Sequence, residues 1–351
     1  MSDDVWSAQD TTPEAIESAL RRLLRERHAA QPSLAPARVL NLIVVVDRDL
    51  KGEVANRLER VGRYHASRTI LCVVEEGRKT LDAVAVMRFE SSPGGTLCVV
   101  HEQVQIDIGP VHLKRLDTII DPIKVTDLTT LLWAPHGHDD AVASILHMCD
   151  VVLRDSDDDD EPSDGLAQSS ELLEAAYVVD LAWLRTTPWR ERLASSFDPP
   201  ERRAVLRHVH DLSIRHNRTS KASAALLAGW LASRLNAQLG AFDGAAESGR
   251  HGTARIAGEQ NEIRIHFEPH DQEAPGLAGV TVAWGRDSSL SLDRSPGGLR
   301  ALQRGRGEER EWRILGASRG EGGILGEGVR QALLRDSTYG PALSAAREIA
   351  A

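Results

Sequence analysis

The chain has 351 residues, of which 41% are hydrophobic, and a formal net charge of −10. This length suits two domains with a sizeable core. No apolar run approaches the roughly 20 residues that a membrane-spanning helix needs, and the acidic start of the chain differs from a secretory signal. Neither half is basic enough for nucleic-acid binding. We therefore expect a soluble, cytoplasmic protein that binds neither membranes nor nucleic acid.

Residues 1–154 alternate between helical and strand patterns. The run 39–46 is almost continuously aliphatic, which is typical of a strand buried on both faces. Helices between such strands predict an α/β domain with a mostly parallel sheet flanked by helices. We expect helices from Pro13 and at 50–63, 110–119 and 139–147, and strands at 39–46, 69–74, 81–89, 96–108, 128–133 and 150–153.

An acidic run separates this domain from the rest of the chain. Residues 155–164 contain seven acidic residues and no basic residue, so they carry most of the net charge. Like charges repel, and nothing in the run can join an apolar core. We therefore predict a solvated linker over residues 155–168. The run lacks the glycine and the distal glutamate that order a calcium loop, so we expect no metal there.

Residues 169–351 are predicted to form a smaller α+β domain, with helices over 169–239 followed by a strand-rich part over 260–351. The first helical stretch, 169–197, must break or restart at Pro188, which has no N–H to donate. We expect further helices at 201–216, 222–239 (capped by Gly240) and 326–335, a loop at 244–258, and strands at 262–267, 279–284, 288–292 and 312–315.

One candidate ligand site lies at the edge of the predicted parallel sheet, because ligands of open α/β sheets bind beyond the carboxyl ends of the strands. Two histidines spaced i, i+2 in a loop could point at one ligand, and a metal would need a third ligand beside them. The alternative is a polar loop that caps the next helix. The side chains at this rim are Asp47, Arg48, Trp133, His136 and His138.

Motifs that would identify an enzyme are missing from the sequence. No Gly-x-Gly-x-x-Gly follows the first strand, and no phosphate-binding loop with Gly-Lys-Ser/Thr occurs. The fingerprints of dinucleotide and nucleotide binding are therefore absent. We expect no cofactor, no metal and no catalytic residues.

The segment 177–192 has the most distinctive composition of the chain, with two tryptophans and three arginines in sixteen residues. Tryptophan and arginine are enriched at the energetic centres of protein interfaces. The segment therefore predicts an exposed apolar patch rimmed by arginine. The alternative is that the tryptophans fill a core and the arginine stems cover it. The candidate partner-binding residues are Trp183, Arg185, Trp189 and Arg190.

Several motifs resemble one family in the same order along the chain. Asp180-Leu-Ala-Trp-x-Arg185 with the later Trp189-Arg190, and the helix around Trp230, resemble the glucose-6-phosphate dehydrogenase assembly proteins, the OpcA family. The resemblance runs from about residue 38 to 239. Its earlier motif residues are His65, Ser67 and Arg68 of the turn His65-Ala-Ser-Arg68, and Asp127 of Asp127-Leu-x-x-Leu-Leu-Trp133. The chain departs from the family at Ala66, where proline is usual, and at Ala134, where a second tryptophan is common.

The resemblance implies a non-catalytic assembly factor or allosteric activator. Such a protein binds glucose-6-phosphate dehydrogenase and promotes its active oligomer in the oxidative pentose phosphate pathway. Activation requires tighter binding to the active form of the enzyme than to the inactive form. Two alternatives stay open: an enzyme acting on a sugar phosphate at the rim formed by residues 133–140, and a sensor in which a phosphate-bearing metabolite binds Arg48 or Arg68. The oligomeric state is left open.

Overall fold

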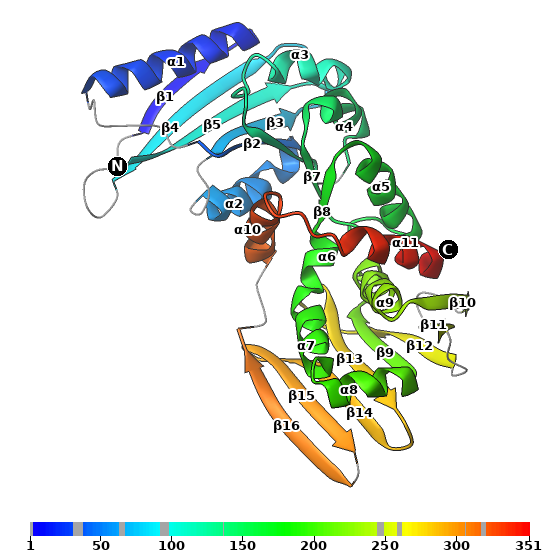
Figure 1. The fold of residues 1–351 in the computed structure, drawn as a ribbon. Helices are drawn as coiled ribbons and strands as arrows, with labels where there is room; N and C mark the ends of the chain where they lie inside the picture. Colours follow the sequence, from blue (N-terminus) through cyan, green and yellow to red (C-terminus); the bar gives the residue numbers. More distant parts are fainter. Residues whose placement is uncertain are drawn as a thin grey trace. The chain divides into compact units, whose positions relative to one another are not determined.

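The computed structural model describes residues 3–30, 38–62, 67–91, 98–135, 137–243, 249–257, 262–305, 307–316 and 321–351. The fold is α/β, as predicted, and Figure 1 shows its elements. Contacts divide the chain into two compact units. Unit 1 comprises Met1–Arg154, Ala175–Val179 and Leu325–Leu333, and unit 2 comprises Asp155–Glu174, Asp180–Ile324 and Leu334–Ala351.

The sheet of unit 1 has the strand order β1-β4-β5-β3-β2-β6-β7-β8. Its centre is parallel, whereas β1, β4 and β5 pair antiparallel. The aliphatic run of β2 is buried along seven of its eight residues, as expected for a strand covered on both faces. The strands are β1 (Asp3–Ala8), β2 (Leu40–Asp47), β3 (Ser67–Val74), β4 (Asp82–Ser91), β5 (Cys98–Ile108), β6 (Thr129–Trp133), β7 (Val151–Arg154) and β8 (Tyr177–Asp180), and the helices are α1 (Pro13–Ala30), α2 (Lys51–Gly62), α3 (Leu116–Ile120) and α4 (Asp139–Ile145).

Unit 2 contains a second sheet, with the order β10-β11-β12-β9-β13-β14-β15-β16. All neighbours pair antiparallel except β9 and β12, which are parallel. The helices of this unit are α5 (Pro162–Ala175), α6 (Leu181–Arg185), α7 (Thr187–Phe197), α8 (Pro200–Arg203), α9 (Lys221–Leu235) and α11 (Tyr339–Ala350), and the strands are β9 (Val209–Asn217), β10 (Ala237–Asp243), β11 (Arg250–Ile256), β12 (Glu262–His270), β13 (Leu277–Trp284), β14 (Ser288–Ser295), β15 (Gly298–Gly305) and β16 (Glu308–Leu315). The helix α10 (Glu321–Gln331) belongs mostly to the Leu325–Leu333 segment of unit 1.

The helix predicted over 201–216 is wrong in its second half, which is the central strand β9. Leu212, Ile214 and His216 alternate with more exposed residues, so the pattern has the period of a strand. A helix does begin at Pro200, but it ends at Arg203. The polar residues between the apolar ones suit either structure locally, and pairing with β12 and β13 decides for the strand.

The predicted helix 222–239 ends earlier than expected. Asn236 adopts a left-handed conformation (φ 52°) and its N–H bonds the carbonyls of Ala232 and Ser233, so Asn236 and not Gly240 ends α9. Gly240 lies in β10. The predicted loop 244–258 contains the strand β11. The four strands predicted after residue 260 did not include β15, and no helix was predicted at α11. The second sheet has eight strands, as many as the first.

The acidic run is not a solvated linker at either end. Asp155 and Ser156 are buried, and α5 begins at Pro162, with Leu166 fully buried. Only the middle of the run has the exposure that like charges favour. The charge pattern failed here because an arginine 30 residues downstream pairs with Asp155, as described below.

The packing of α9 on α11 depends on Gly229. A Cβ added there would lie 2.3 Å from the carbonyl oxygen of Ala342 and 2.7 Å from the amide nitrogen of Ala346. We expect Gly229→Ala to lower the free energy of unfolding by about 1–3 kcal/mol through overpacking. The matched control is Gly340→Ala in α11, where an added Cβ meets nothing within 4 Å. This control should instead stabilise the protein slightly, because alanine favours helix. Thermal unfolding of both variants tests whether the first is less stable and the second slightly more stable than the unaltered chain.

Candidate functional site

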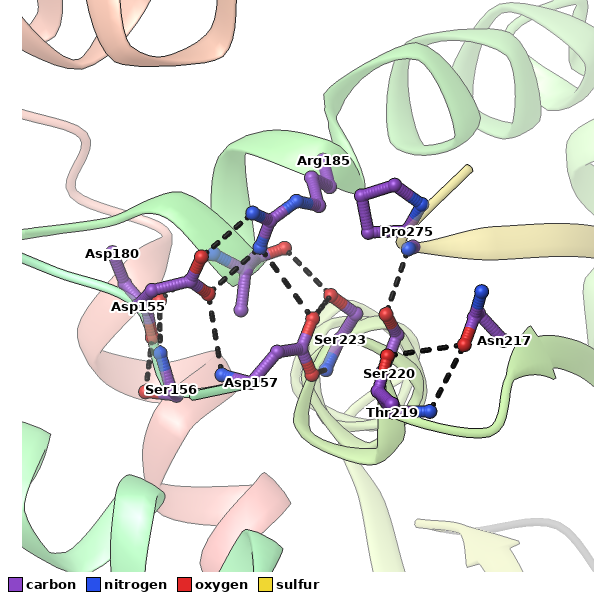
Figure 2. Close-up of polar contacts among 12 residues, drawn as sticks. Asp155, Ser156, Asp157, Asp180, Arg185, Asn217, Thr219, Ser220, Ser223 and Pro275 are labelled. Atoms are coloured by element: carbon purple, nitrogen blue, oxygen red, sulfur yellow. Dashed lines mark hydrogen bonds and ion pairs between the residues drawn. The ribbon is translucent and has the colours of Figure 1, made fainter. Parts of the chain in front are cut away.

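Asp180 is the centre of a buried polar cluster in unit 2 (Figure 2). It ends β8 and caps α6, since its Oδ1 accepts the amide N–H of Ala182 at 2.9 Å. Ser156 donates its amide N–H to Oδ1 (3.1 Å) and its hydroxyl to Oδ2 (2.6 Å). The hydroxyl of Tyr339 in α11 donates to Oδ2 at 2.9 Å. Asp180 thus ties three segments together that are distant in sequence.

Arg185, at the end of α6, supplies the positive charge of the cluster. Its two terminal nitrogens donate to the two carboxylate oxygens of Asp155 at 2.7 and 2.6 Å, a bidentate arrangement that Figure 2 shows. One of these nitrogens also lies 3.6 Å from a carboxylate oxygen of Asp157. The side chains of all three residues are less than 10% exposed. A single guanidinium therefore faces two buried carboxylates of the acidic run.

Asp157 links the acidic run to the start of α9. It accepts the amide N–H of Ser223 at 3.0 Å and a further bond from the Ser223 hydroxyl. Burial raises the pKa of Asp157 to about 7, and the nearby charge of Asp155 adds to the effect. Burial likewise raises the pKa of Asp180, with Asp155 again contributing. Asp155, Asp157 and Asp180 are all buried, and Arg185 lies beside only the first two, so the cluster carries excess negative charge, which protonation relieves.

The structure contradicts the prediction of an exposed patch over 177–192. Trp183 and Trp189 are buried, Arg185 is held in the cluster, and the side chain of Arg190 is 11% exposed. The guanidinium of Arg190 lies 3.4 Å from the ring centroid of Trp183. The indole N–H of Trp183 donates to Asp336 at 2.9 Å. The alternative interpretation holds: these side chains form an interior, and burial lowers the pKa of Arg190 to about 10.

The cluster has a structural role in unit 2. Each carboxylate accepts hydrogen bonds from backbone or side-chain donors of the same unit. Arg185, Ser156 and Ser223 join α5, α6 and α9, because Ser156 also contacts Ser169 of α5 at 2.8 Å.

The predicted rim of unit 1 is brought together only in part. Because β2 and β6 are parallel neighbours, Asp47 and His138 meet at the same sheet edge, with Nε2 of His138 3.5 Å from Oδ1 of Asp47. His138 has a left-handed backbone (φ 68°), which is uncommon for a residue with a side chain. Trp133 instead points into the core, with the guanidinium of Arg57 5.0 Å from its ring centroid. Arg48 pairs with Glu75 at 3.1 Å.

The early motif residues have structural positions as well. Ser67 and Arg68 are buried, and Arg68 pairs with Glu102 (2.7 Å) and Glu17 (2.8 Å). A metabolite phosphate therefore cannot reach Arg68 without breaking these pairs. Asp127 is exposed in a turn with φ 64°, and Trp230 is buried in α9. His65 and His136 lie outside the described residues.

Within the described ranges, no group of three or more histidine, cysteine or carboxylate side chains is arranged to hold a metal ion. No helix in the part of the chain that the structure describes combines the length and the apolar character that a membrane span needs.

An exposed group that sequence reasoning missed lies on the edge strand β16. Trp312 and Ile314 continue the apolar face that Leu299 and Ala301 bury in β15, but they are themselves half exposed. The guanidinium of Arg310 lies 5.6 Å from the ring centroid of Trp312. Arg313 is exposed, and Leu315 is 77% exposed. Because successive strand residues face opposite sides, Arg310 and Trp312 lie on this face and Arg313 and Leu315 on the other. We call these four residues of the edge strand the β16 patch. The sequence offered one signal for this patch, a tryptophan flanked by arginines. Only the strand pairing of the folded sheet shows that β16 is an edge strand.

Comparison with known proteins agrees with the resemblance. Residues 176–343 match the family described as the C-terminal domain of a glucose-6-phosphate dehydrogenase subunit. This part of the chain is thus similar to the OpcA family. A curated protein of Nostoc punctiforme, "Putative OxPP cycle protein OpcA", is 32% identical over 177 residues, 49% of this chain and 36% of that protein. The protein of the same name from Synechococcus elongatus is 26% identical over 279 residues, 76% of this chain and 57% of that protein. The chain thus spans about half the length of these relatives, or less.

The fold also resembles solved structures of oxidoreductases. The 3-ketoreductase KijD10 from Actinomadura kijaniata, solved with NADP and TDP-benzene, has a TM-score of 0.52 at 8% identity, covering 89% of this chain and 96% of that one. At this identity the likeness concerns the fold alone. It agrees with an α/β unit followed by a unit built on a mostly antiparallel sheet.

Proposed function

We propose that this chain is a non-catalytic effector that binds glucose-6-phosphate dehydrogenase and promotes its active oligomer in the oxidative pentose phosphate pathway. The observation that carries the proposal is the family match over residues 176–343, whose description names a subunit of that dehydrogenase. The curated relatives carry the name of the oxidative pentose phosphate cycle. The missing nucleotide-binding motifs support a role other than catalysis.

The contact surface that we propose is the β16 patch. A partner can contact only exposed side chains, and Trp183, Arg185 and Trp189 are buried, while the side chain of Arg190 is 11% exposed. The β16 patch lies inside the matched segment and combines Trp312 with two arginines and the exposed Leu315. Tryptophan and arginine dominate the energetic centres of interfaces. As an edge strand, β16 also offers backbone groups on which a partner strand can pair.

The test is a titration of glucose-6-phosphate dehydrogenase from the same organism with this chain, measuring the substrate KM, kcat and complex formation by size exclusion. We expect a saturable fall in KM or a rise in kcat. The double variant Trp312→Ala with Leu315→Ser should need about tenfold more protein for half the effect, because interface centres lose more than about 1 kcal/mol on truncation.

The matched control is Val111→Ser, which removes a similarly exposed apolar side chain from unit 1 and should leave the titration unchanged. No effect of the unaltered chain, together with no complex, would refute the proposed function. Equal activation by the double variant and the unaltered chain would retain the function but reject the β16 patch as the contact surface.

A further inference from the structure

A pocket of about 320 Å³ lies in unit 2 between helices and the sheet. Its walls come from the ends of α7 and α9, where Phe197 and Trp230 contribute their rings. Its floor comes from strands β9, β12 and β13, through Leu212, Ile265 and Val282. The ring of Phe197 stacks edge-on against Trp284 at 5.6 Å between centroids, which fixes one wall. The volume is within the range of small-molecule sites.

Small side chains explain why this space is not filled. Ala228 and Ala232 of α9 and Ala254 of β11 line the pocket at positions where larger aliphatic side chains would close it. The pocket reaches solvent, because Leu231 and Leu235 are half exposed and Arg234 is exposed. Apolar walls in contact with water are a source of binding free energy for an apolar ligand.

The charged groups of the pocket determine which apolar ligand fits best. Of the 19 lining residues, 16 are apolar, and the others are Asp198, Arg203 and Arg234. The two arginines give the lining one excess positive charge. A terminal nitrogen of Arg203 donates to the carbonyl oxygen of Asp198 at 2.8 Å, which anchors this guanidinium beside the end of α7. Guanidinium groups favour carboxylates and sulfonates over cations.

We propose that this pocket binds a small amphipathic organic anion, with the apolar body between Trp230 and the sheet and the anionic end at Arg203 and Arg234. The pocket is distinct from the β16 patch, since none of its lining residues belongs to β16. The proposal therefore stands or falls independently of the proposed function.

The test uses the full chain and the probe 1-anilinonaphthalene-8-sulfonate, which pairs an aromatic body with a sulfonate. We expect saturable fluorescence enhancement at one site under native conditions. Decanoate should displace the probe at least about tenfold more effectively than decyltrimethylammonium, which has the same chain length and the opposite charge. Arg234→Glu, at an exposed position, should weaken decanoate binding about tenfold, because it replaces a charge-assisted contact with a like-charge repulsion.

Two further variants locate the site. Ala232→Leu fills the pocket and should abolish displaceable binding, with native circular dichroism as its folding check. Arg264→Glu is the matched charge control, because Arg264 lies on β12 but on the face opposite to Ile263 and Ile265, which line the pocket. The Arg264→Glu variant should bind the probe and decanoate as the unaltered chain does. Absence of saturable binding, equal competition by the anion and the cation, or unchanged binding in Arg234→Glu would each overturn the proposal.

Discussion

Replacing Arg185 with methionine is expected to lower the free energy of unfolding by about 3–5 kcal/mol at pH 7, because it leaves buried carboxylates without their counter-charge. The guanidinium makes a bidentate pair with Asp155 and lies beside Asp157, and all three side chains are nearly inaccessible to water. Because methionine retains much of the side-chain volume, the lower free energy of unfolding reports the missing charge and not a cavity. Urea unfolding followed by tryptophan fluorescence measures it, since five of the seven tryptophans lie in unit 2.

The control is Arg304→Met, which breaks an exposed pair, with Nε of Arg304 2.8 Å from a carboxylate oxygen of Glu309. Exposed pairs contribute about 1 kcal/mol or less. A loss for Arg185→Met no larger than that for Arg304→Met would show that the buried cluster does not stabilise unit 2 as the geometry implies.

Replacing Asp157 with asparagine is expected to make the protein more stable than the unaltered chain above pH 7 and equally stable near pH 4. The folded-state pKa of Asp157, about 7, is above its ordinary value of 3.8. Between these values the folded protein holds a proton that the unfolded chain releases, so rising pH favours unfolding. The variant has no such proton, and its advantage should reach at most about 4 kcal/mol at pH 8.

The measurement is the free energy of urea unfolding at half-unit steps from pH 4 to pH 8, expressed as variant minus unaltered chain. Burial and Asp155 also raise the pKa of Asp180. This gives the free energy of unfolding the same pH dependence in both proteins, so the contribution of Asp180 cancels in the difference. Asp271→Asn serves as the control, because that carboxylate is fully exposed and its pKa is lowered by Arg218. A difference curve for Asp157→Asn that is flat across this range would exclude Asp157 as the proton-binding group.

These two results bear on how unit 2 is held together. Asp155 and Asp157 of the acidic run reach Arg185 and Ser223, and Asp180 reaches Tyr339, so the cluster joins parts of the chain up to 159 residues apart. Both charged ends of the motif Asp180 to Arg185 are therefore used inside the unit. Partner contact, in our proposal, is left to the exposed edge of the sheet.

Local pattern alone determined much of unit 1. The aliphatic runs in β2, β3 and β6 predicted buried parallel strands, and the polar residues that follow β2 and β6 were expected at one edge, where Asp47 and His138 do meet. In unit 2, a restart at Pro188 was predicted within a helical stretch over 169–197, and α7 does begin at Thr187, with Pro188 in its first turn. The same prediction missed the strand β8 (Tyr177–Asp180), which interrupts that stretch. The features that were predicted correctly depend on period and backbone chemistry within a few residues.

Only the tertiary structure determined those features that depend on residues far away in the sequence. The sequence could not show that Asp155 is buried, because its counter-charge lies 30 residues away, nor that β9 is a strand, because its neighbours β12 and β13 follow much later in the chain. The same limit applies to Trp183 and Trp312: both have arginine neighbours, yet one is interior and the other lies at a sheet edge. Composition gives the residue types of an interface, but exposure depends on which elements cover them, and that is determined only when the chain is folded.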